Sequence, residues 1–60
     1  MIFDKIKRIS EEKGLSISAL EKKAGLGNGT VAGWKDNSPT LGKLQAVAAV
    51  LDVKVSDIVD

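Results

Sequence analysis

The sequence contains no cysteine and no histidine. Without cysteine there are no disulfides, and without either residue there is no zinc site of thiolate or imidazole ligands. Nucleophiles of the Ser-His and Cys-His kinds are excluded for the same reason. No group of residues suggests catalysis, a metal site, a cofactor or a small-molecule substrate. We therefore expect a protein that is not an enzyme.

Long hydrophobic runs are also missing. The longest, residues 46–51, is six residues long, whereas a membrane-spanning helix needs about 20. The first residues do not show the basic segment followed by an apolar one that marks a secretion signal. We therefore expect a cytoplasmic domain with no membrane partner.

The chain has 60 residues, which is enough for one hydrophobic core, so we expect a single domain over residues 1–60. Its net charge of +1 does not by itself indicate a nucleic-acid partner. The distribution of charge is more informative. Residues 22–43 contain four lysines and one acid, whereas residues 52–60 contain three aspartates and one lysine. The middle of the chain is thus the part that suits a phosphate backbone.

Apolar residues recur at helical spacing, which predicts an all-α fold. Isoleucines line one face of a helix over about 2–13, which we expect Gly14 to end in the left-handed conformation. The strongest periodic pattern follows Thr40, a good N-cap. Its apolar stripe consists of Leu41, Leu44, Val47, Ala48 and Leu51. We expect the chain to leave this helix at Asp52.

A second helix is predicted to begin after the N-cap Ser16 and to end at Gly25. The segment Ser18–Glu21 also fits a capping box, which would move the start by two residues. Both starting points remain open at this stage.

A third helix is predicted over about 28–36, with Val31 and Trp34 on its inner face. Gly29 and Gly33 each cost about 1 kcal/mol relative to alanine inside a helix. Something other than helix propensity must therefore support this segment. Two short helices joined by a tight glycine-containing turn form a helix-turn-helix candidate over about 16–36.

A last short helical turn is predicted near the end of the chain. Its apolar residues are Val53, Val55, Ile58 and Val59. These side chains either close the core or form the seam of a homodimer, and the sequence does not decide between the two.

Residues 15–26, 30–34, 38–44 and 48–53 together resemble the phage-repressor/Cro-type (Xre-like) helix-turn-helix family. The resemblance covers nearly the whole chain without gaps. It implies a compact, lambda-repressor-like DNA-binding domain of four to five helices. It also implies a transcriptional regulator, of the phage or prophage repressor type, that binds operator double-stranded DNA, usually as a symmetric dimer.

The resemblance implies roles for particular residues. The helix over 28–36 would enter the major groove, where the base-reading positions are Asn28, Gly29, Thr30 and Gly33. The positions expected to contact the DNA backbone are Ser16, Ile17, Lys35, Asn37 and Lys43.

This sequence departs from the family at the groove-facing positions. Gly29, Ala32 and Gly33 offer no side-chain hydrogen bond, so only Asn28 and Thr30 can read base edges with their side chains. A rival hypothesis follows from this departure. The same fold would then serve as a protein-interaction module, such as an antitoxin or accessory protein, with little DNA readout.

Overall fold

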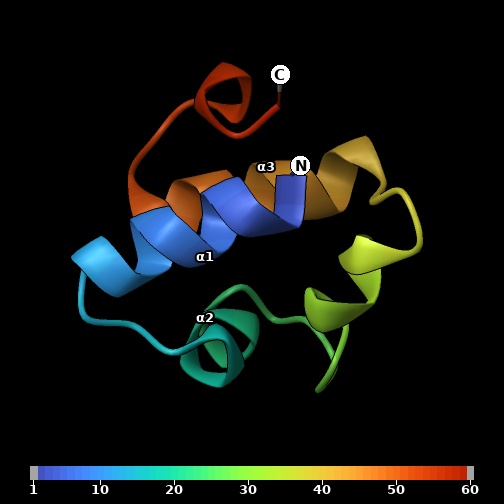
Figure 1. Ribbon diagram of the computed structural model, residues 1–60, viewed down its shortest axis with the longest axis horizontal. Helices are drawn as coiled ribbons and strands as arrows, with labels where there is room; N and C mark the ends of the chain where they lie inside the picture. The colour runs from blue at the N-terminus through green and yellow to red at the C-terminus, as the bar shows by residue number, and fades with distance from the viewer. Residues whose placement is uncertain (1, 60) are drawn as a thin grey trace.

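The computed structural model describes residues 2–59, and these form three α-helices and two short 3-10 helices with no strand (Figure 1). The helices are α1 (Ile2–Glu12), α2 (Ile17–Lys23), η1 (Ala32–Lys35), α3 (Leu41–Leu51) and η2 (Val55–Asp57). The all-α prediction is confirmed. The expected four to five helices are reduced to three α-helices, because the other two segments form only single 3-10 turns.

All three α-helices end in the same way. In α1, Gly14 adopts a φ of +73° while the Leu15 N–H donates to the Ser10 carbonyl at 2.8 Å. This is the hydrogen-bond pattern of a Schellman motif. Gly25 ends α2 with the same φ, and Asp52 ends α3 with a φ of 57°. The three predicted stop positions are therefore confirmed.

Hydroxyl side chains begin the second and third α-helices. The Oγ of Ser16 accepts a hydrogen bond from the Ala19 N–H at 3.1 Å, which places the N-cap of α2 at Ser16 rather than at Ser18. The Oγ1 of Thr40 accepts from the Lys43 N–H at 3.4 Å at the start of α3. Each cap satisfies an N–H that has no partner within its own helix.

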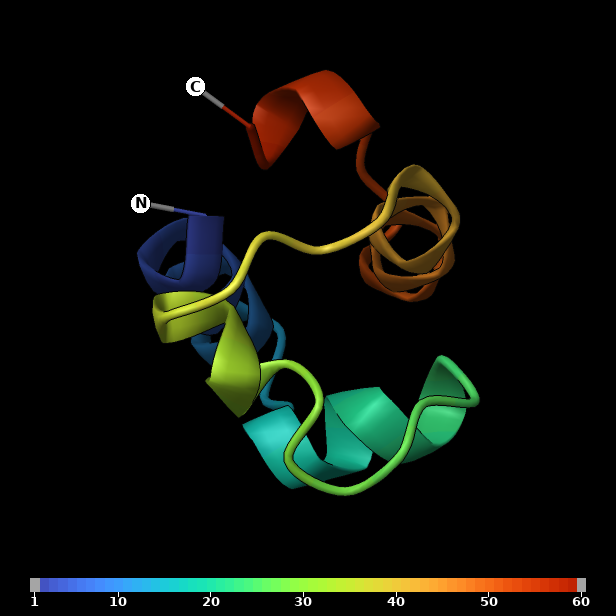
Figure 2. The same ribbon diagram turned by 90° about the vertical axis from the view of Figure 1, so that its right-hand side faces the viewer.

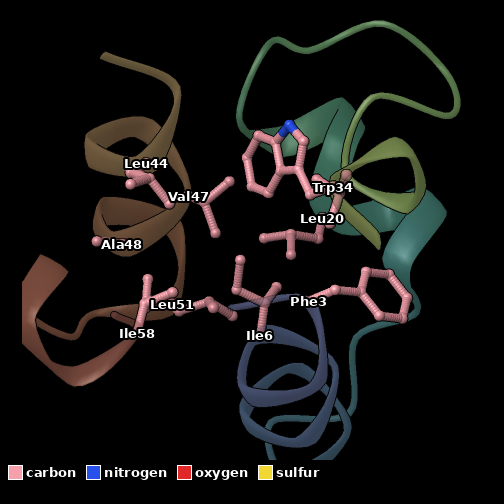
Figure 3. Close-up of a cluster of buried hydrophobic side chains, with 10 residues drawn as sticks. Phe3, Ile6, Leu20, Trp34, Leu44, Val47, Ala48, Leu51 and Ile58 are labelled. Carbon is pink, nitrogen blue, oxygen red and sulfur yellow. The ribbon is translucent and has the colours of Figure 1, made fainter. Parts of the chain in front are cut away.

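One core joins all of these elements. Figure 3 shows Ile6 of α1, Leu20 of α2 and Val47 of α3 pointing toward one another, with Trp34 of η1 above them. Trp34 is only 8 % exposed, so it packs in the core as its spacing from Val31 indicated. Ile58 is fully buried and closes the core beside α3.

The predicted apolar stripe of α3 is wrong at one position. Leu41 is 63 % exposed, whereas Leu44, only 7 % exposed, is the first buried residue of the stripe. An apolar stripe is buried only where another element packs against it. The elements that pack against α3 therefore begin to do so one turn after Thr40.

Residues 28–36 do not form the predicted α-helix. The chain passes through turns over 28–31 and then forms η1, a single 3-10 helix. Gly29 adopts a φ of +87°, far outside the right-handed helical region, so no regular helix can include it. Helical turns nevertheless remain, since the Gly33 N–H donates to the Gly29 carbonyl at 3.0 Å.

The two ends of the molecule differ in the elements they carry. In both ribbon views α2 and the loop that follows it lie at one end, and η2 lies at the opposite end (Figures 1 and 2). α1 and α3 lie between them. Within residues 2–59, no helix combines the length and hydropathy needed to cross a membrane, and no cluster of acidic side chains suited to a metal was found.

Candidate nucleic-acid interface

The candidate interface is built on residues 27–37, which we call the recognition segment. Its leading residues Gly27, Asn28 and Gly29 are exposed, and Thr30 and Gly33 are half-buried. Val31 and Trp34 are buried and hold the segment against the core. The segment therefore has one inner apolar side and one exposed side that begins at Gly27, Asn28 and Gly29.

A hollow of about 280 Å³ lies between the recognition segment and the start of α3. The residues that line it are Gly29, Thr30, Gly33, Trp34, Asn37, Ser38, Pro39, Thr40 and Lys43. Five of the nine positions expected to contact DNA thus meet at one surface feature, although they come from two different elements. Asn28 is exposed beside the hollow but does not line it.

The chemistry of this hollow suits an anion. Among the residues that line it, Thr30, Ser38 and Thr40 carry hydroxyls, Asn37 carries an amide and Lys43 carries an ammonium group. None of the described residues that line it is acidic. Hydroxyl, amide and ammonium donors are the groups that bind phosphate oxygens in protein–DNA interfaces.

Lys35 does not join this group. Its Nζ lies 4.8 Å from the centre of the Phe3 ring, which is a cation–π distance, so its side chain is turned toward the start of α1. This contact joins η1 to α1, which pack against each other. Lys35 is exposed and lines a neighbouring hollow together with Asn37, Ser38 and Pro39.

Ser16 and Ile17 lie at the start of α2 and do not line the hollow. The hydroxyl oxygen of Ser16 accepts the N-cap hydrogen bond from the Ala19 N–H, as Thr40 does for Lys43 at the start of α3. Backbone N–H groups in the first turn of a helix have no partner within the helix, and these are the groups expected to meet a phosphate. That expectation stays a prediction.

Glu21 is a residue of the site that the sequence patterns did not indicate. It is only 3 % exposed, and its Oε1 accepts from the Gly29 N–H at 3.0 Å while its Oε2 accepts from the Val31 N–H at 2.8 Å. Within the described residues, every buried side-chain nitrogen or oxygen has a hydrogen-bond partner. The capping-box pattern Ser18–Glu21 assigned Glu21 to the start of its own helix, α2, whereas its side chain binds the recognition segment. The only sequence signal for this role was that the glycine-rich segment needed support from elsewhere in the fold.

The candidate dimer seam is divided by the structure. Ile58 is fully buried in its own chain, while Val53, Val55 and Val59 are half-buried. Ile58 thus closes the core, which is one of the two roles left open by the sequence. The three valines are the members that retain exposed surface.

Comparison with known sequences identifies relatives over the whole chain. Residues 5–60 match the family described as the Cro/C1-type HTH DNA-binding domain. The chain is 38 % identical over 63 aligned positions to the HTH-type transcriptional regulator SinR of Bacillus subtilis (strain 168). It is 36 % identical to SinR of Bacillus licheniformis. Each alignment covers 100 % of this chain and 57 % of the relative, so the chain spans little more than half of their length.

Comparison with solved structures agrees with this result. The N-terminal DNA-binding domain of SinR from Bacillus subtilis has a TM-score of 0.90 at 38 % identity, covering 100 % of this chain and 91 % of that chain. A crystal structure of SinR, the master regulator for biofilm formation, in complex with DNA has the same TM-score and identity and covers 100 % of both chains. The protein therefore belongs to the family of Cro/C1-type helix-turn-helix DNA-binding domains.

Proposed function

We propose that this protein binds double-stranded operator DNA in a sequence-specific manner and regulates transcription. The observation that carries the proposal is the hollow between the recognition segment and α3, where hydroxyl, amide and ammonium donors gather without an acid among the described residues. The likeness to a SinR structure solved with DNA supports the same assignment. The recognition segment then enters the major groove, and the rim of the hollow follows a DNA strand.

Each part of the site has a proposed role. Asn28 and Thr30 read base edges with their side chains, and Gly29 and Gly33 allow the backbone to come close to the bases. Lys43 and Asn37 bind phosphate at the hollow, and the first N–H groups of α2, at Ser16 and Ile17, bind a second phosphate. Lys35, whose ammonium group lies over the Phe3 ring, binds phosphate beside the hollow.

The finer parts of the proposal concern the whole regulator. Residues 1–60 act as one helix-turn-helix domain of a repressor of the phage or prophage type, working in the cytoplasm where its DNA is. A homodimer would use Val53, Val55 and Val59, which keep exposed surface at the end of the molecule opposite α2. A two-fold dimer predicts a palindromic operator.

Selection of bound duplexes from random DNA tests this proposal and yields the operator. The affinity for the selected duplex is then measured at several salt concentrations. Phosphate contacts release counterions, so the affinity should fall steeply as salt increases. Lys43→Ala should lower the slope of this salt dependence by about one ion, while Lys54→Ala, an exposed lysine near η2, should leave it unchanged. An affinity that does not change with salt would refute binding to the DNA backbone.

The rival function is a protein-interaction module with the same fold. It is favoured by one observation: the outer side of the recognition segment presents Gly29, Ala32 and Gly33, whose side chains cannot bond to a base. Asn28→Ala separates the two functions. A loss of preference for the selected duplex supports base readout, whereas unchanged DNA binding supports the interaction module.

A further inference from the structure

We propose that Glu21 is a positioning residue that determines which DNA sequence the recognition segment prefers. The proposal rests on the DNA-binding function proposed above. Glu21 itself is buried in α2, and its carboxylate accepts hydrogen bonds from backbone N–H groups of the segment. It therefore acts through the residues that it holds.

The two bonds of Glu21 bracket one base-reading position. Its carboxylate oxygens accept from the N–H groups of Gly29 and Val31, at 3.0 and 2.8 Å, and Thr30 lies between them. The Thr30 N–H donates in turn to the Gly27 carbonyl at 3.1 Å. The three successive N–H groups of Gly29, Thr30 and Val31 are thus held in place by hydrogen bonds. A helix usually receives such bonds from the residue that directly precedes it, whereas here they come from another helix.

The recognition segment has little regular structure of its own. It contains three glycines and only one 3-10 helix, so few of its backbone hydrogen bonds belong to a regular helix. Glu21, by contrast, sits on α2 next to Leu20, which is fully buried in the core. The carboxylate therefore fixes the backbone on both sides of Thr30 relative to the core, and it also fixes Gly29, which directly follows Asn28.

The charge of Glu21 makes this role testable, because charge and position predict opposite effects. Removal of an acid near a DNA-binding surface should strengthen binding to any polyanion. Loss of positioning should instead weaken binding to the preferred sequence alone. The decisive quantity is therefore the ratio of the affinities for the selected duplex and for a scrambled duplex of the same length.

Glu21→Gln is the main variant, and Glu12→Gln, at an exposed residue of α1, is the control with the same change in charge. The amide keeps the shape of the side chain but has one acceptor oxygen in place of two. We expect the preference ratio to fall about tenfold in Glu21→Gln, as when one good base contact is lost. Both variants should bind the scrambled duplex at least as tightly as the parent, and Glu12→Gln should keep the parental ratio.

Glu21→Asp separates position from charge, because it keeps the carboxylate and shortens its reach by one methylene. We expect its preference ratio to fall as well. Amide hydrogen exchange provides the structural readout. The N–H groups of Gly29 and Val31 should exchange faster in Glu21→Gln and Glu21→Asp than in the parent, while the N–H of Val47 in the core should stay slow. This pattern distinguishes a released segment from an unfolded domain.

Parental preference ratios in Glu21→Gln and Glu21→Asp would overturn the proposal, whatever the exchange data show. A fall in the ratio that is accompanied by fast exchange at Val47 would also overturn it, because the whole domain would then be unstable. If the unaltered protein binds no DNA at all, the proposed function fails first and the role of Glu21 in DNA readout fails with it. Failure of the two claims is thus distinguishable.

Discussion

α3 and the recognition segment pack into the same core but differ in how regular their backbones are. Both place apolar side chains in the core: Leu44, Val47, Ala48 and Leu51 come from α3, and Val31 and Trp34 come from the recognition segment. α3 becomes an 11-residue α-helix, while the recognition segment forms turns and the 4-residue η1. Thr40, directly before α3, caps it, whereas the recognition segment is capped by Glu21 of another helix. A helix that carries its own cap and stripe forms from local information, and one that lacks them takes its shape from a tertiary contact.

Composition explains much of this difference. α3 consists mainly of leucine, alanine and valine, with Gly42 as its single glycine. The recognition segment has glycine at 27, 29 and 33. Each glycine costs about 1 kcal/mol relative to alanine in a helix interior. A regular α-helix is therefore unfavourable in this segment, and the hydrogen bonds from Glu21 stabilise an irregular backbone conformation instead.

The largest loss of stability is expected from a substitution on the side of α3 that packs into the core. Leu51→Ala should lower the free energy of unfolding by about 2–5 kcal/mol, because Leu51 is fully buried and its removal leaves a cavity. Leu41→Ala is the matched control on the same helix and should change stability little, since Leu41 is 63 % exposed. Urea denaturation measures both. Equal losses in the two variants would contradict the assignment of the buried stripe.

A smaller loss of stability is expected when the side chain of Glu21, which caps the recognition segment from α2, is removed. Glu21→Ala leaves the N–H groups of Gly29 and Val31 without their acceptors, which should cost about 1–3 kcal/mol. Glu12→Ala, at an exposed position, should cost much less. Urea denaturation of the two variants side by side gives the comparison. If their stabilities are the same, the recognition segment does not depend on Glu21.

Replacing two glycines of the recognition segment by alanine should change the stability of the protein in opposite directions. Gly29→Ala should destabilise the protein by about 1–2 kcal/mol, because Gly29 has a φ of +87° that L-residues adopt at a cost. Gly33→Ala should stabilise it by about 0.5–1 kcal/mol, since a Cβ at Gly33 would meet no atom within 4 Å. Thermal unfolding followed by circular dichroism reports the direction of each change. A destabilising Gly33→Ala would mean that the segment resists further helix formation.

The local caps should show the smallest effects. Ser16→Ala should cost about 1 kcal/mol, because its hydroxyl accepts from the Ala19 N–H at 3.1 Å. Thr40→Ala should cost about half as much, since the corresponding hydrogen bond at 3.4 Å is longer. The midpoints of urea denaturation should follow this order. The reverse order would indicate that Thr40 supports more than the first turn of α3.

Local patterns were sufficient to predict most of the fold. Helical spacing located α1, α2 and α3, and the stop positions at Gly14, Gly25 and Asp52 were all confirmed. Such features depend on residues within four positions of one another, so the order of amino acids encodes them directly. The same holds for the predicted core position of Trp34, which follows from its spacing to Val31.

The candidate site was less predictable than the fold. The family resemblance indicated Asn37 and Lys43, and the structure brings both to one hollow. It did not indicate that Lys35 turns toward Phe3, because that contact joins two elements far apart in the chain. Spacing along one helix carries no information about what packs over it.

By itself, the sequence determined the positions of α1, α2 and α3, the residues at which they end, and which of their faces are apolar, but it left the start of α2 open. Tertiary structure alone decided the conformation of residues 28–36 and the burial of Glu21. The physical reason lies in the range of the interactions involved. Caps and helical spacing act between near neighbours, whereas the carboxylate of Glu21 reaches residues eight and ten positions away only after α2 has packed into place.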